Sequence, residues 1–209
     1  VSLTEVRRAC EVRLPEFANF LNIFASPQIK NIGTLVGNVA NASPIGDTVP
    51  FLMVADAVVH LSSSRREREV PLTEFYLAYR TMAKKPDELI TAVSFALPTA
   101  HESLRIFKVS QRKDLDISTV NSAFLFRMEK TSQAVIKEAR IAYGGIGPVV
   151  RRFPEVETYL EGKSLTLEVV DHAAALIQQD ILPLSDVRGT SAYRRVLVDG
   201  LFRRYCEEL

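Results

Sequence analysis

The chain has 209 residues, of which 47% are hydrophobic and 24% charged, so it can bury enough apolar surface for a stable core. Lys and Arg number 26 against 25 Asp and Glu, and this balance excludes DNA or an anionic lipid surface as the main partner. An apolar run long enough to span a membrane and an N-terminal signal peptide are both missing, which favours a soluble, cytoplasmic protein. The two cysteines are too few for a disulfide framework, a four-cysteine zinc site or an iron–sulfur cluster.

Two helices are predicted at the start of the chain. Ser2 begins a capping box, and Pro15 opens an amphipathic segment that extends to Phe24. Pro27 should end this second helix, because proline disfavours helical geometry in the residue before it. Residues 28–50 are rich in Gly, Asn, Ser and Pro, and the aliphatic residues between them favour an ordered functional loop over disorder.

Short alternating elements are predicted after this loop. A helix at 51–58 leads into a strand at 57–62, and a charged turn then precedes a second strand and a short helix that starts at Pro71. Apolar and polar residues alternate along residues 88–97 well enough to predict a further strand. The polar segment 98–103 marks a predicted boundary between two parts of the chain.

The second half of the chain has strands first and helices after them. The predicted strands are 104–111, 118–128 and 135–144, the last two joined by a polar turn at 129–132, and the predicted helices are 153–160, 166–178 and 191–207. This order indicates a small α+β layer in which helices cover one face of an antiparallel sheet.

The last predicted helix carries an apolar stripe at helical spacing. Its members are Tyr193, Val196, Leu197, Gly200, Leu201 and Tyr205. A core face is favoured over a subunit contact for this stripe, and Gly200 would allow close packing.

Motifs typical of catalysis or metal binding are missing from the sequence. The three histidines are scattered, with no carboxylate or cysteine at metal-ligand spacing. The sequence has no Gly-x-Ser-x-Gly motif, Walker loop or His-Glu-x-x-His motif. A Gly-x-Gly-x-x-Gly run after a strand is missing too, so a Rossmann dinucleotide site has no support.

The glycine-containing part of residues 28–50 gives the strongest signal of function. Gly33 and Gly37 permit positive φ and remove side-chain bulk, so the segment from Thr34 to Asn38 could direct consecutive N–H groups towards an anion. A plain connection explains such a loop equally well. A second charge cluster follows a predicted strand and comprises Lys108, Arg112, Lys113, Asp114 and Asp116. Taken alone, it is best interpreted as a solvated hairpin turn.

Together these two segments resemble the molybdenum hydroxylase family. The run FASPQIKNIGTLVGNVANASPIGD, residues 24–47, is similar to the second flavin-binding segment of that family. Further similar segments follow in the same order, namely FYLAYR, PDELI, FKVSQRKDLDIS, AYGGIGP and DVRGTSAYRR. The resemblance therefore covers nearly the whole chain, and the FKVSQRKDLDIS pattern favours the small subunit of a bacterial xanthine dehydrogenase.

The resemblance implies an α+β fold in two parts. Residues 1–100 would form the second part of a vanillyl-alcohol-oxidase/PCMH-type FAD-binding domain, truncated because the first subdomain with its pyrophosphate loop would precede Val1. Residues 101–209 would form a C-terminal domain like that of the carbon monoxide dehydrogenase flavoprotein, with a three-stranded antiparallel sheet packed on helices.

The implied function is electron transfer in purine catabolism. Electrons would pass from [2Fe–2S] clusters through FAD to NAD⁺, with an iron–sulfur domain and a molybdopterin-binding subunit as partners on other segments or chains. One alternative is the flavoprotein part of another molybdenum hydroxylase, of the carbon monoxide dehydrogenase medium-subunit or aldehyde oxidase type. Another is a cofactor-free fragment that docks to other subunits, and the plainest is an α+β domain without a ligand.

The resemblance also implies which residues contact the cofactor. The backbone of residues 34–38, namely Thr34, Leu35, Val36, Gly37 and Asn38, would surround FAD with donors. Phe24 would lie beside the flavin, Asp47 would offer a polar contact, Ile90 would cover the flavin ring and Lys108 would be a polar neighbour of that ring. Arg112 and Asp116 would lie on a loop that approaches the ring and tunes access of the electron acceptor. Val36 replaces the first glycine of the family's usual pair, where a β-branched residue would be strained if φ is positive. A catalytic residue and a metal ligand are not expected in this chain.

Overall fold

The computed structural model describes residues 1–113, 115–129 and 134–209; the sequence predictions for Asp114 and for residues 130–132 lie outside this part. Its helices are α1 (Leu3–Cys10), α2 (Pro15–Ile23), α3 (Pro27–Ile32), α4 (Leu35–Ala40), α5 (Val49–Val54), α6 (Leu72–Phe75), α7 (Pro154–Leu160), α8 (Leu167–Gln179) and α9 (Ser191–Glu207). Its strands are β1 (Val58–Ser62), β2 (Glu67–Pro71), β3 (Tyr76–Ala78), β4 (Thr81–Met82), β5 (Leu89–Ser94), β6 (Glu102–Val109), β7 (Val120–Glu129), β8 (Val135–Gly144) and β9 (Arg151–Arg152).

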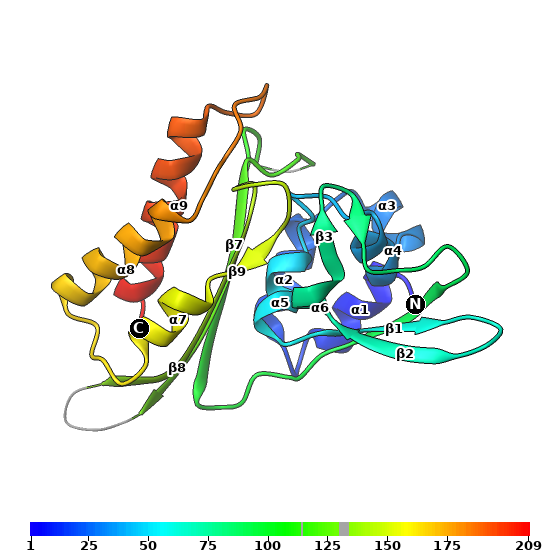
Figure 1. Cartoon of the computed structure of the whole chain (residues 1–209), viewed down its shortest axis with the longest axis horizontal. Coiled ribbons are helices and arrows are strands. Elements are labelled where there is room, and N and C mark those ends of the chain that lie inside the picture. Colours follow the sequence, from blue (N-terminus) through cyan, green and yellow to red (C-terminus); the bar gives the residue numbers. More distant parts are fainter. Residues whose placement is uncertain (114, 130–133) are drawn as a thin grey trace.

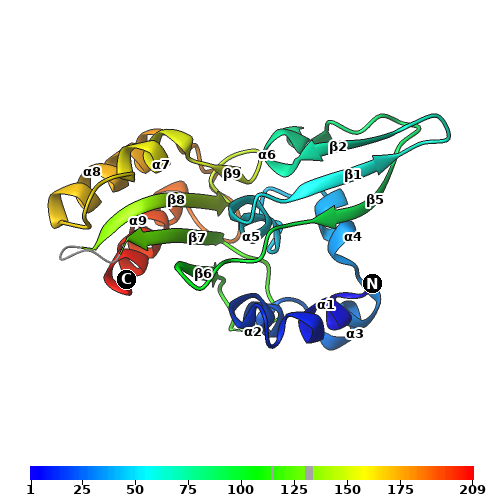
Figure 2. The same ribbon diagram turned by 90° about the horizontal axis from the view of Figure 1, so that it is seen from below.

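A long antiparallel sheet lies at the centre of the molecule, with helices on both sides (Figure 1). Its strand order is β6-β7-β8-β9, and a second sheet of order β2-β1-β5 extends away from it in the first half of the chain (Figure 2). The predicted α+β fold is therefore confirmed. The three predicted strands of the second half are all present, and the two-residue strand β9 adds a fourth, too short and too charged to give a sequence signal.

The two faces of the central sheet belong to two different cores. Leu104, Ala123 and Leu125 point to one face and pack with the helices and strands of the first half. Phe124 and Phe126, which alternate with them on β7, point to the other face and pack with α7, α8 and α9. Alternation along one strand thus supplies both cores, since successive side chains of a strand point to opposite faces.

The segment from 28 to 50 is ordered but not irregular, so the prediction of a long loop is wrong. It contains α3, α4 and the start of α5. Two side chains explain the difference: the Ser26 hydroxyl accepts from the N–H of Ile29, and the Thr34 hydroxyl accepts from the N–H of Gly37. Each hydroxyl caps a helix of six residues, which is too short to show helical periodicity in the sequence.

The buried face of α9 differs from the predicted apolar stripe. Leu201 and Tyr205 are buried as predicted, but Tyr193 and Val196 are 48% and 68% exposed. A Cβ added at Gly200 would meet nothing within 4 Å, so this glycine is not a site of close packing. Apolar residues occur on more than one side of α9, and the central sheet and α8 select the buried side. The other buried members of that side are Arg194, Val198 and Phe202.

A buried carboxylate joins β2 to the segment before β5. Glu88 is 1% exposed and accepts two hydrogen bonds from Arg68, at 2.7 and 2.8 Å, together with one from the N–H of Lys85. The hydrogen bonds from Arg68 are the main reason that the pKa of Glu88 falls to about 2. This ion pair fixes the start of β5.

Membrane-spanning helices and metal-ligand clusters are both missing from the described residues. No helix among them is long and apolar enough to cross a membrane. The same part of the chain has no group of three or more His, Cys, Asp and Glu side chains placed to hold a metal ion. Both cysteines, Cys10 and Cys206, are free.

Candidate functional site

The predicted anion-binding segment is the start of α4. Thr34 is its N-cap, with an extended backbone and a hydroxyl 2.8 Å from the N–H of Gly37. Leu35 and Val36 are the first two helical residues, so their N–H groups have no acceptor within the helix. Helix geometry, rather than glycines with positive φ, orients the N–H groups of this segment, and a contact between them and an anion remains a prediction.

The departure at Val36 causes no backbone strain. Val36 lies within α4, and its φ is not among the positive values of the described residues. Gly33 has a φ of −63°, which any residue can adopt. The glycine at position 37 matters for another reason, because a Cβ there would lie 3.0 Å from the Thr34 hydroxyl that caps the helix.

A groove of about 470 Å³ runs along the start of α4. One wall is the segment Thr34–Val36, and the other is formed by residues 91–93 of β5 together with Phe95. Val1 and Val6 close one side of it. Mainly apolar walls with two backbone N–H donors suit a flat aromatic ligand that carries an anionic chain.

A buried ion pair lies near the end of β6. The Lys108 ammonium is 2.5 Å from Oδ2 of Asp47, and the two side chains are 3% and 9% exposed. Asp47 Oδ1 also accepts from the hydroxyl of Ser118 at 2.5 Å and from the amide of Asn121 at 3.2 Å. The ammonium lies 6.0 Å from the centre of the Phe24 ring, at the outer limit of a cation–π contact. The structure therefore brings the predicted residues Phe24, Asp47 and Lys108 together.

Helix α4 connects the groove to this ion pair. The side-chain oxygen of Asn38 accepts from the hydroxyl of Thr48 at 2.6 Å, and Thr48 follows Asp47 in the sequence. At the next residue of α4, the Tyr76 hydroxyl donates to the carbonyl of Val39 at 3.0 Å. Burial raises the pKa of Tyr76, so this donor keeps its proton. These hydrogen bonds tie α4, whose start lines the groove, to β3 and to the segment that carries Asp47.

The position of Phe24 is fixed by a buried lysine of α3. The Lys30 ammonium donates to the carbonyls of Leu21 and Asn22 at 2.8 and 2.9 Å, which caps the end of α2. Burial lowers the pKa of Lys30, but its carbonyl partners keep it in place. Phe24 follows immediately as the C-cap residue of α2.

Arg112 and Asp116 form an exposed turn after β6. The carboxylate of Asp116 accepts from the N–H of Arg112 at 2.8 Å and from the N–H of Ile117 at 2.9 Å, and it lies 3.4 Å from the Arg112 guanidinium. The hydrogen bond from the Arg112 N–H is the largest reason that the pKa of Asp116 is lowered. The Arg112 side chain is 73% exposed. The side chains of Arg112 and Asp116 therefore match the interpretation of the charge cluster as a solvated turn. Lys108 does not match it, because its side chain is buried.

Ile90 lies on β5 beside the groove. Its side chain is half-buried against the core of the first half. A β-bulge occurs at this point, because Leu61 pairs with Ile90 while the preceding His60 pairs with Ala92. Thr91 is the extra residue, and it lines the groove. A contact between Ile90 and a ring remains a prediction.

Sequence reasoning missed two partners of the ion pair and one wall of the groove. Asn121 lies directly opposite Lys108 in the β6–β7 register, and both are polar residues in apolar strands. That pairing is a signal that could have identified Asn121. Ser118 lies just before β7 and gives no comparable signal. The groove wall that β5 forms depends on the β-bulge at Thr91, and no pattern in the sequence predicts that bulge.

Comparisons with known proteins agree with this geometry. A family model described as "FAD binding domain in molybdopterin dehydrogenase" matches residues 1–99. A second, described as "CO dehydrogenase flavoprotein C-terminal domain", matches residues 105–209. Each model covers about half of the chain, and together they cover nearly all of it.

Individual relatives extend over the same length. Nicotinate hydroxylase hnxS of Emericella nidulans is 34% identical over 97% of this chain, and xanthine dehydrogenase of the same organism is 30% identical over 100% of it. The chain spans only 15% and 16% of the length of these two relatives. A chain of the reconstituted CO dehydrogenase from Oligotropha carboxidovorans has the same fold, with a TM-score of 0.88 and 25% identity over 98% of this chain and 71% of that one. The chain therefore belongs to the FAD-binding family of the molybdopterin dehydrogenases, the molybdenum hydroxylases.

Proposed function

We propose that this chain holds FAD in a xanthine dehydrogenase-type enzyme and passes electrons from iron–sulfur clusters, through the flavin, to NAD⁺. The observation that carries the proposal is the buried Asp47–Lys108 pair beside Phe24, close in the fold to α4, whose start lines the groove. The iron–sulfur domain, the molybdenum-binding subunit and a cytoplasmic location are parts of the same proposal.

The residues present fit FAD. The N–H groups at the start of α4 would donate to oxygens of the cofactor's anionic chain, and the groove beside them has mainly apolar walls, which suit an aromatic group. The ammonium of Lys108 would be a polar neighbour of the ring next to Phe24. Bound FAD supplies a carrier that accepts electrons and releases them as a hydride.

The chain's own contribution to this chemistry is position and charge. Asp47 neutralises Lys108 in a region from which water is excluded, so the net charge near the ring stays low. A cation near a flavin stabilises its reduced anionic form and a carboxylate opposes it, so the balance of this pair tunes the flavin's potential. Asn121 and Ser118 hold the carboxylate in a fixed orientation. A general base is not required.

The first test is titration of the purified chain with FAD while flavin fluorescence is followed. Saturable quenching is expected for the wild-type chain. Gly37→Val should weaken FAD binding at least tenfold, because its side chain meets the Thr34 hydroxyl that orients the start of α4. Gly200→Ala is the matched control, since a Cβ at that position meets nothing. Equal affinities for the two variants would contradict the placement of FAD on α4.

The NAD⁺ half of the proposal needs a separate test in the complete enzyme. Arg112→Glu replaces an exposed cation by a carboxylate and breaks the contact with Asp116, so it should lower the flavin potential and slow NAD⁺ reduction. Spectroelectrochemistry and stopped-flow reduction of NAD⁺ measure the two effects. If neither changes, the turn does not control the electron acceptor.

The alternatives within the family have specific support. The nicotinate hydroxylase relative is 34% identical and the xanthine dehydrogenase relative 30%, while the CO dehydrogenase chain shares the fold. The flavoprotein part of another molybdenum hydroxylase is therefore the second candidate, and a substrate screen of the complete enzyme separates the two. A chain that folds but does not bind FAD would favour the cofactor-free docking fragment.

A further inference from the structure

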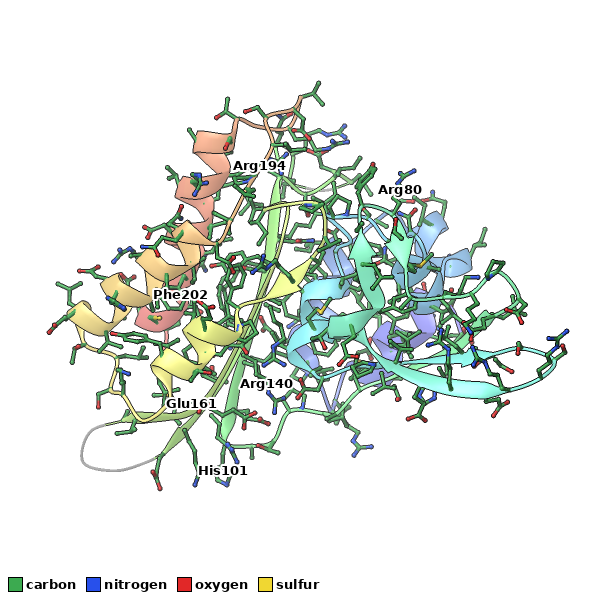
Figure 3. All side chains as sticks on the ribbon, in the orientation of Figure 1. Arg80, His101, Arg140, Glu161, Arg194 and Phe202 are labelled. Carbon is green, nitrogen blue, oxygen red and sulfur yellow. The ribbon has the colours of Figure 1, made fainter. Side chains whose placement is uncertain are left out.

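Two sequence motifs of the second half meet at one buried side chain. Arg194 belongs to the DVRGTSAYRR run, and it is 4% exposed where α9 packs beside the long strands (Figure 3). Its Nη1 donates to the carbonyl of Thr119 and, at 3.3 Å, to the carbonyl of Gly145 in the AYGGIGP run. Its Nη2 donates to Asp186 at 2.7 Å. A single guanidinium thus joins α9, the residue before β7 and the turn after β8.

The two carbonyls belong to segments that bracket Asp47. Thr119 follows Ser118, whose hydroxyl donates to the Asp47 carboxylate at 2.5 Å. Gly145 donates its N–H to the carbonyl of Pro44 at 2.8 Å, three residues before Asp47. One segment therefore fixes the side chain of Asp47, and the other fixes the backbone that carries it.

The approach of these segments requires glycine in the turn. Gly145 has a φ of +82°, and a Cβ there would lie 2.4 Å from the Thr119 carbonyl oxygen and 3.0 Å from Nη1 of Arg194. Gly144 is similarly enclosed, because its Cβ would lie 2.1 Å from the side-chain oxygen of Asn121. Gly145 therefore lets the guanidinium reach both carbonyls, while Gly144 leaves room for Asn121 beside Asp47.

We propose that Arg194 is a positioning residue for the Asp47–Lys108 pair, acting through the carbonyls of Thr119 and Gly145. It holds the two segments at the spacing that keeps the carboxylate against the ammonium. Its effect on FAD rests on the proposed function, but its effect on the ion pair does not.

The test compares Arg194→Met and Arg194→Lys with Arg195→Met. Arg195 is the matched control, because it lies on the same helix and also donates to two backbone carbonyls, those of Gln178 and Ile181, away from the ion pair. The readout in the FAD-free chain is the NMR signal of the Lys108 ammonium, which is visible when its protons are held in slow exchange. Amide exchange of Gly145 is the second readout, and FAD affinity is the third.

Arg194→Met should abolish the Lys108 signal, accelerate exchange of the Gly145 amide at least tenfold and weaken FAD binding at least tenfold. Arg195→Met should lower stability and leave all three unchanged within about twofold. An Arg194→Met chain that keeps the Lys108 signal and the Gly145 protection overturns the proposal. If Arg194→Met does not fold, Arg194→Lys decides in the same way, with partial losses expected because a single nitrogen on a shorter side chain replaces the planar fork that donates to the two carbonyls and to Asp186. A wild-type chain that shows the Lys108 signal but does not bind FAD contradicts the proposed function and leaves this inference standing on its first two readouts.

Discussion

The Asp47–Lys108 pair can be tested by a double-mutant cycle in which Lys108→Met and Asp47→Asn are made separately and together. Both replacements keep the approximate size of the side chain and remove one charge. Among the described residues each group is the other's ion-pair partner, and both side chains are at least nine-tenths buried. The cycle therefore isolates one interaction in a site where charges are poorly solvated.

The magnitudes follow from what each variant leaves behind. Lys108→Met leaves the Asp47 carboxylate with two neutral donors, Ser118 and Asn121, so the loss is placed at the lower end of the range for breaking a buried pair, about 3 kcal/mol. Asp47→Asn leaves a buried ammonium facing an amide and should also cost about 3 kcal/mol. The double variant keeps neither charge, so its loss should be about 3 kcal/mol rather than the sum of about 6 kcal/mol.

Urea unfolding of the four proteins at neutral pH measures these values. Equal slopes with different midpoints would show that stability changed without a change in the surface exposed on unfolding. The expected coupling energy is about 3 kcal/mol. If the two single losses add to within about 0.5 kcal/mol in the double variant, the pair does not interact and the description of the site is wrong.

Further predictions concern a depressed pKa and two glycines. Hydrogen bonds from Arg68 lower the pKa of Glu88 to about 2, below its ordinary value in the unfolded chain. The ionised carboxylate therefore contributes to the free energy of unfolding fully above about pH 4.5, and this contribution is lost as the pH falls towards 2. Thermal melting should therefore show Glu88→Gln less stable than wild type at pH 7, with a difference that shrinks by pH 3; a constant difference would refute the assignment. Gly144→Ala should cost about 1–3 kcal/mol in urea unfolding, because its Cβ would overlap the side-chain oxygen of Asn121. Gly200→Ala should instead stabilise the chain by about 0.5–1 kcal/mol, because it replaces glycine within a helix where nothing obstructs a methyl group.

Local sequence signals predicted the parts of the fold whose causes are local. The capping box at Ser2 gave the start of α1, and the bounds of α9 were predicted as the structure has them. The helices α3 and α4 were missed, because their hydroxyl caps occur in a segment whose Gly and Asn content predicts a loop. The strand β9 was missed because it has only two residues and both are arginines.

In the candidate site, too, some residues could be predicted from the sequence and other contacts depend on segments that are far apart in the chain. The resemblance placed Phe24, Asp47 and Lys108 near one another, and the structure brings them together. It could not give the hydrogen bonds to Asp47 from Ser118 and Asn121, which lie 71 and 74 positions further along the chain. Contacts over such distances depend on the register of β6 with β7, and a shift of one residue would point Lys108 to the opposite face.

The shared sheet has a consequence for recombination between relatives. The two family models meet between residues 99 and 105, yet Ile106, Ala123 and Leu125 of the second matched segment pack into the core of the first. A chimaera that joins residues 1–99 of one relative to residues 105–209 of another would therefore inherit two halves of a core that were selected separately. Exchange at this boundary should yield folded protein only between relatives whose residues on this face of β6 and β7 have matching volumes.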